Sequence, residues 1–160
     1  MANFDSNTGQ DRYKKGQKFH EHMHFVLQQR GCELLGEGTP EEDMEGIDYW
    51  YEMPKRFANC WSRWDGGSPC PIVAVDYKVM FGEHLGVQDR MRKSKTEAYV
   101  FGRVFPKKKL VAVYMISKER FWSHPRLRSR VNKHGEKYWY IHRDFVTTRD
   151  FHRLGGRYFD

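Results

Sequence analysis

The chain has 160 residues, of which 39% are hydrophobic and 16% aromatic, so it is too apolar for a disordered chain and long enough for one domain with a core. The formal net charge of +7 suits a polyanionic partner such as nucleic acid. No apolar run approaches the roughly 18 residues of a membrane span, and three cysteines without a C-x-x-C pair favour a reducing compartment. We therefore expect a cytoplasmic protein without membrane contact.

The N-terminal part of the chain predicts one helix. Residues 1–10 are polar and are expected to form a flexible arm. From residue 11 to residue 30, apolar side chains recur at steps of three and four, and Gly31 suits the end of the helix; the apolar positions are Phe19, Met23, Val26 and Leu27.

The rest of the chain is rich in β-prone stretches separated by turn residues. We expect a loop or short helix over residues 82–96, a helix capped by Ser117, and a turn or helix over residues 145–154. Residues 54–70, with two prolines and the pair Gly66-Gly67, are expected to form an insertion. The predicted strands cover residues 32–35, 45–53, 71–80, 97–105, 110–117 and 138–142. This order predicts a single α/β domain with a mixed central sheet flanked by helices.

The stretch 71–80 (PIVAVDYKVM) combines an apolar, β-branched run with two opposite charges. Side chains in a strand alternate between faces, so Asp76 and Lys78 point to the same side. Burial of charge is costly unless the charges are paired or bound to a metal. A solvated ion pair at the end of the strand is the simplest explanation of such a D-x-K triplet.

A carboxylate on the preceding strand, Asp48, favours a second explanation. Asp48 and Asp76 can converge at one edge of the sheet and form the oxygen site that Mg²⁺ or Mn²⁺ prefers. Such a metal ion polarises a phosphate and activates water, and Lys78 beside it could orient or deprotonate that water. This constellation points to hydrolysis of a phosphodiester bond.

This arrangement resembles the PD-(D/E)xK nuclease superfamily of restriction enzymes and Holliday-junction resolvases. The segment YKKGQKF, with Leu27 and Gly31, is similar to the opening helix of the archaeal resolvases. The segments VFGRV at residues 100–104 and VYMISKERF at residues 113–121 are similar to the outer strands of small phage-type members. The resemblance spans roughly residues 13–150 and implies a restriction-endonuclease-like fold for a single domain of residues 1–160.

The resemblance also implies an activity and a set of site residues. Asp48 and Asp76 would bind Mg²⁺ or Mn²⁺, and Lys78 would be catalytic, in an endodeoxyribonuclease that leaves a 3′-hydroxyl and a 5′-phosphate. Three features depart from the family pattern: Ile47 replaces the proline before the first acid, the interval between the two acids is long, and the helix position that often carries a glutamate is His20, followed by Glu21. Either His20 or Glu21 would complete the site. Small family members pair to cut two strands, so the resemblance implies a homodimer. The likeness to phage-type members also implies a phage-encoded enzyme in a bacterial host.

Two alternatives remain open. A chain with the same fold and a degraded site would bind nucleic acid without cutting it. The string from His20 to His24 also fits H-E-x-x-H, in which two histidines on one helix face bind zinc and Glu21 acts as the base of a metalloprotease.

Basic residues gather in several clusters that suit phosphate contacts. The stretch before the strand at residues 97–105 and the turn after it are predicted to bind DNA through Arg90, Arg92, Lys93, Lys95, Lys107 and Lys108. A third cluster comprises Arg126, Arg128, Arg130 and Lys133. Tryptophans between these clusters could stack on unpaired bases or fill the core.

Overall fold

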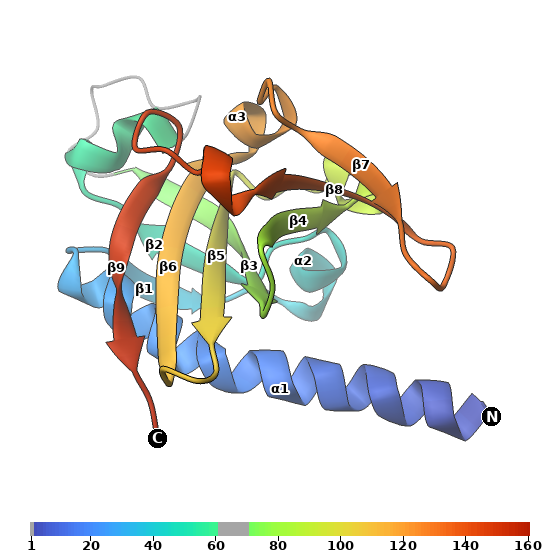
Figure 1. Ribbon diagram of the computed structural model, residues 1–160. Helices are drawn as coiled ribbons and strands as arrows, with labels where there is room; N and C mark the ends of the chain where they lie inside the picture. Colours follow the sequence, from blue (N-terminus) through green and yellow to red (C-terminus); the bar gives the residue numbers. More distant parts are fainter. Residues whose placement is uncertain (1, 61–70) are drawn as a thin grey trace.

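A computed structural model describes the backbone of residues 2–60 and 71–160, and the side chains of residues 16–57 and 71–160. Its elements, shown in Figure 1, are α1 (Ala2–Gln29), β1 (Glu33–Glu37), α2 (Pro40–Met44), β2 (Tyr49–Glu52), the 3₁₀ segment η1 (Lys55–Cys60), β3 (Ile72–Met80), β4 (His84–Gln88), η2 (Asp89–Lys93), β5 (Ala98–Phe105), β6 (Leu110–Ser117), α3 (Lys118–Trp122), β7 (Arg128–Val131), β8 (Lys137–His142), η3 (Arg143–Phe145) and β9 (His152–Tyr158).

Six strands form the central sheet in the order β1-β2-β3-β5-β6-β9. Strands β3 and β5 run parallel, and the other neighbours are antiparallel. The sheet is mixed and forms the centre of one α/β domain, as the sequence predicted, and it is curled. The parallel pair requires a crossover, which is made by β4 and η2 rather than by a long helix.

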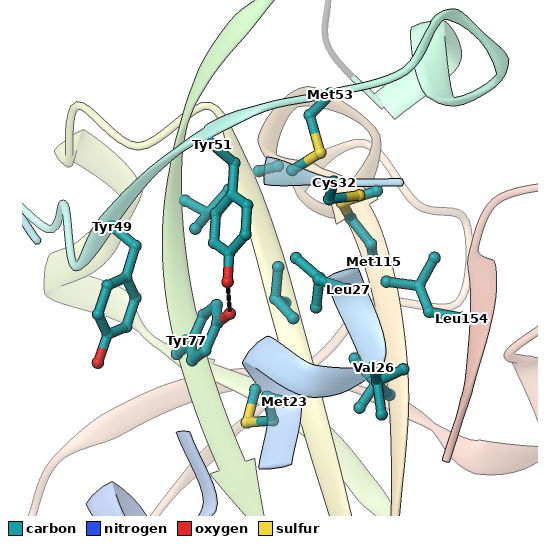
Figure 2. Close-up of a cluster of buried hydrophobic side chains, with 14 of the residues drawn as sticks. Met23, Val26, Leu27, Cys32, Tyr49, Tyr51, Met53, Tyr77, Met115 and Leu154 are labelled. Atoms are coloured by element: carbon teal, nitrogen blue, oxygen red, sulfur yellow. Dashed lines mark hydrogen bonds between the residues drawn. The ribbon is translucent and has the colours of Figure 1, made fainter. Parts of the chain in front are cut away.

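Helix α1 lies across one face of this sheet (Figure 1). The four apolar positions read from the sequence are all buried, in contact with side chains from β2, β3, β5 and β6. Figure 2 shows this cluster, in which Tyr51 and Tyr77 point from neighbouring strands toward one another and share a hydrogen bond of 2.6 Å. Alternate residues of β2 and β3, including Tyr49, Tyr51 and Tyr77, therefore face α1.

The other face of the central sheet is covered by a second, three-stranded antiparallel sheet in the order β4-β8-β7. Leu85, Val87 and Ile141 of this small sheet pack on Tyr99, Phe101 and other side chains of β5 and β6. The sequence predicted a sheet flanked by helices. In the described residues α1 covers one face of the sheet, whereas strands cover most of the other.

The remaining boundaries differ in several places from those expected. Helix α1 begins at Ala2, where the sequence pattern indicated an arm. The undecided stretch 82–96 contains β4 and η2, whereas 145–154 contains the end of η3 and the start of β9 in place of a helix. Ser117 does cap α3, since its hydroxyl accepts a hydrogen bond from the Arg120 amide at 3.1 Å. Residues 61–70 of the expected insertion lie outside the described residues. Within the described part of the chain, no helix is long and apolar enough to cross a bilayer.

Candidate active site

Asp48 and Asp76 lie side by side on adjacent strands. Tyr49 pairs with Val75 in the antiparallel register of β2 and β3, so the next step places Asp48, just before β2, opposite Asp76. The two carboxyl groups are close enough to share a hydrogen bond. The structure therefore brings these two acids together, as expected from the sequence.

The backbone fixes the orientation of Asp48. Its amide donates to the carbonyl of Val75 at 3.0 Å, and its own carbonyl accepts from Gly38 at 2.8 Å. Its side-chain Oδ2 accepts a 2.8 Å hydrogen bond from the amide of Tyr77, the middle residue of the D-x-K triplet. Asp48 is therefore held from three directions, and its side chain is aimed at β3.

A third carboxylate, Asp43, belongs to the same cluster. It comes from α2, a short helix that begins with a capping box in which Thr39 and Glu42 bond each other's amides. Asp43 is exposed and lies close enough to Asp48 for the two side chains to share a hydrogen bond when one of them is protonated. Partial desolvation, and then the neighbouring Asp48, raise the pKa of Asp43.

Asp76 is the most deeply buried member, with 3% of its surface exposed. Its Oδ2 lies 3.1 Å from Lys78 Nζ, but this is a charge contact without hydrogen-bond alignment, so Oδ2 has no hydrogen-bond partner among the described residues. Burial and the adjacent Asp76 raise the pKa of Asp48 to about 7. The cluster therefore holds more negative charge than Lys78 alone neutralises.

These features fit a divalent cation. A buried carboxylate oxygen without a hydrogen-bond partner and a neighbouring acid with a raised pKa would both gain from a positive charge between them. No group of three or more histidine, cysteine or acidic side chains in the described residues is arranged to hold a metal ion. Mg²⁺ commonly uses only one or two carboxylates and takes its other ligands from water and substrate phosphates.

His20 and Glu21 are not part of this cluster. His20 Nδ1 lies 2.8 Å from the hydroxyl of Tyr49, and Glu21 is exposed on α1. Because side chains alternate along a strand, Tyr49 and Tyr77 face α1 while Asp48, Asp76 and Lys78 face the opposite side. The central sheet separates the two sets, so the structure does not bring the predicted helix residue to the site.

The H-E-x-x-H string forms a different arrangement, a set of histidine–tyrosine hydrogen bonds beneath the sheet. His24 Nδ1 contacts the hydroxyls of Tyr51 and Tyr77, the latter at 2.8 Å. Burial lowers the pKa of His24 to about 4, and burial together with His24 lowers that of His20 to about 4. Both rings are therefore neutral at pH 7 and bonded to tyrosine.

The predicted DNA-contacting residues fall into two groups. The first group comprises Arg90, Arg92, Lys93 and Lys95. Of these, Lys95 is tied to the segment between α2 and Asp48, because its amide donates to the Glu45 carbonyl at 2.8 Å and its side chain forms an ion pair with Glu45. Arg92 lies over the rings of Trp122 and Trp139, at 4.7 and 5.3 Å. Lys107 and Lys108 lie at the other end of β5, in the exposed turn at the bottom of Figure 1.

Two members of the site were missed by sequence reasoning. Asp43 could have been found from the T-P-E-E string that starts α2, because a capping box predicts a helix whose last turn carries this acid. Tyr99 pairs with Asp76 in the parallel register of β3 and β5, and its hydroxyl accepts from Trp122 Nε1 at 2.9 Å. Burial, with a smaller contribution from Asp76, raises the pKa of Tyr99 to about 12. No local pattern indicates this pairing.

No protein-family model, curated protein or solved structure matches this chain significantly.

Proposed function

We propose that this protein is a metal-dependent nuclease that hydrolyses phosphodiester bonds of DNA, with a restriction-endonuclease-like site. The observation that carries the proposal is the meeting of Asp48, Asp76 and Lys78 from two adjacent strands, with a buried Asp76 oxygen to which no described residue donates a hydrogen bond. A helix followed by strands that bear an acid and then D-x-K is also the order that the resemblance implies. Arginine and lysine side chains beside the cluster suit a phosphate backbone.

Each residue has a role that follows from its position. Asp48 and Asp76 would hold the cation, and the Tyr77 amide keeps the Asp48 carboxylate turned toward it. Bound Mg²⁺ or Mn²⁺ supplies a positive charge that polarises the scissile phosphate and lowers the pKa of a water molecule. Lys78, whose side chain is 22% exposed, can reach solvent to orient or deprotonate the attacking water and to screen charge that develops on the phosphate.

The test is cleavage of branched, duplex and single-stranded DNA with Mg²⁺ by Asp76→Asn and Lys78→Gln. We expect each variant to lose roughly 10²-fold or more of the activity, the range for removal of a positioned acid or base. His20→Ala and Glu21→Gln are matched controls, because both side chains lie on the other side of the sheet, and they should cut as the parent does. If Asp76→Asn and Lys78→Gln also cut at the parental rate, the site assignment is wrong.

A further inference from the structure

The small sheet has an outer face that the proposed chemistry does not use. In β4 and β8, Leu85, Val87 and Ile141 point inward to the core, so the alternate residues point away from the central sheet. The register pairs Arg128 with Tyr140 and Arg130 with Tyr138, which puts these side chains on the same side. We call the set His84, Arg128, Arg130, Tyr138 and Tyr140 the outer sheet face.

Aromatic rings form a row on this face. His84 stacks on Tyr140 with ring centroids 4.0 Å apart and planes 19° apart, and Tyr138 follows at 5.8 Å from Tyr140. Gly86 lies between them, and a Cβ at this position would meet the side chains of Tyr138 and Tyr140 at 3.5 and 3.6 Å. The glycine therefore places no side chain beside the two tyrosine rings, both of which are partly exposed.

Positive charge borders the aromatic row. All four residues of β7 are exposed, and β7 is the free edge of the small sheet, projecting from the right of the molecule in Figure 1. Arg130 lies near enough to His84 to contribute to the lowering of its pKa, together with burial, the largest cause, and His142. The lowered pKa favours the neutral form of His84, whose ring presents a π-face beside the arginines.

The outer sheet face also connects to the candidate active site. A depression of about 370 Å³ adjoins His84 and Tyr138, is also lined by Glu83 and Glu136, and extends to Met80, the last residue of β3. Met80 follows Lys78 by two residues on the same side of the strand, a step of roughly 7 Å. A ligand that occupied this depression would lie against the strand that carries Asp76 and Lys78.

We propose that the outer sheet face binds single-stranded DNA, with bases stacked on Tyr138 and Tyr140 and phosphates held by Arg128 and Arg130. Stacked rings accept bases of any sequence but require them to be unpaired, because the faces of paired bases are covered by their neighbours. Arginines at the free edge supply the electrostatic attraction that follows a phosphate backbone. This inference rests on the proposed nuclease function for the choice of DNA and names the form of the substrate.

Binding is best measured without cleavage, by fluorescence anisotropy in EDTA. The probes are a labelled oligothymidylate of about 20 nucleotides, longer than the ~4–16 nucleotides that a small binding domain covers, and a duplex and an oligouridylate of equal length. We expect the oligothymidylate to bind more tightly than the other two probes. Tyr138→Ala and Tyr140→Ala should each weaken binding roughly tenfold, within the range for loss of one stacked base.

Three variants separate stacking from other causes. Tyr140→Phe keeps the ring and should bind as the parent, and its thermal melt shows whether the sheet is intact. Tyr158→Ala removes an exposed tyrosine of β9, on the central sheet, and should leave binding unchanged. Arg130→Gln should weaken binding and reduce the salt slope by about 0.7, the value for one phosphate contact on a single strand.

Several results would overturn the proposal: no binding of the oligothymidylate, tighter binding of the duplex, parental binding by both tyrosine-to-alanine variants, or an equal loss in Tyr158→Ala. Tighter binding of the oligouridylate would overturn the choice of DNA. Asp76→Asn distinguishes this inference from the nuclease proposal, because it should bind the oligothymidylate as the parent does while losing cleavage. If Asp76→Asn cuts normally and Tyr140→Ala still loses binding, the assignment of the nuclease site is wrong, whereas the proposal that the outer sheet face binds single-stranded DNA stands.

Discussion

The amide of Tyr77 donates a 2.8 Å hydrogen bond to Oδ2 of Asp48, and this bond joins the start of β2 to the middle of the D-x-K triplet. Because Tyr77 lies between Asp76 and Lys78, the bond places three ionisable side chains around one point of the sheet. The same residue sends its side chain to the opposite face, where its hydroxyl bonds Tyr51. The candidate site is thus attached to the core through one residue of β3.

The pair of acids should make the folded protein less stable as the pH rises. The folded pKa of Asp48 is raised to about 7, above an unfolded value near 4, so the folded state binds more protons between these values and loses stability from pH 4 to 7. Asp48→Asn removes the ionisation, so the variant should be more stable than the parent at about pH 8, and this advantage should shrink toward pH 5. Urea unfolding at the two pH values measures the effect. An advantage that does not depend on pH would contradict it.

A divalent cation should offset the loss of folding stability that the two neighbouring acids cause. Mg²⁺ or Mn²⁺ that binds the folded state only would raise the melting temperature of the parent, by an amount that grows with the logarithm of its concentration. Asp76→Asn should abolish this response, because it replaces the buried carboxylate, one oxygen of which has no hydrogen-bond partner in the described part of the chain. Asp144→Asn, a change at an exposed acid of η3, is the matched control and should respond as the parent does. An equal response in all three proteins would place the cation elsewhere.

Gly38, which lies between β1 and α2 and bonds the carbonyl of Asp48, should tolerate no side chain. A Cβ added there would overlap the carbonyl oxygen of Ile47, so the backbone beside Asp48 would have to move. We expect Gly38→Ala to cost about 1–3 kcal/mol of stability and to lower cleavage together with it. Gly36→Ala is the matched control, because among the described residues beyond its chain neighbours no atom lies within 4 Å of its added Cβ, and it should leave activity unchanged. Equal behaviour of the two variants would show that this loop does not position Asp48.

The local part of this site could be predicted from sequence because it depends on the two-residue period of a strand. The apolar run before Asp76 identified β3, and alternation put Asp76 and Lys78 on one side. The register that brings Asp48 opposite Asp76 is set by hydrogen bonds between strands, and the sequence only made this meeting plausible.

The errors concern relationships across the sheet. Helical spacing identified the side of α1 that packs inward, but no pattern indicates which face of the sheet it covers, so His20 was expected at a site from which the sheet separates it.

Strand β9 was missed because it buries only Leu154 and contains two glycines, so the apolar alternation of a strand is weak. Strand β7 was missed because all four of its residues are exposed.

The histidines beneath the sheet should give stability the opposite pH dependence from Asp48. The folded pKa of His20 is lowered to about 4, below an unfolded value near 6.5, so the unfolded state binds more protons between these values. The contribution is complete above about pH 6.5 and is lost as the pH falls toward 4. It amounts to roughly 3 kcal/mol at most, since each pKa unit is worth about 1.4 kcal/mol.

His20→Gln should therefore flatten the loss of stability between about pH 6.5 and 4.5, as measured by urea unfolding at intermediate pH values. Glu21→Gln, on an exposed position of the same helix, should keep the parental slope. Zinc added at about pH 7 provides a second comparison, because a zinc site made by the H-E-x-x-H string would raise the melting temperature of the parent and not that of His20→Gln. We expect no such difference, since His20 Nδ1 and His24 Nδ1 are already bonded to tyrosine hydroxyls. A zinc response lost in His20→Gln would instead favour the metalloprotease alternative.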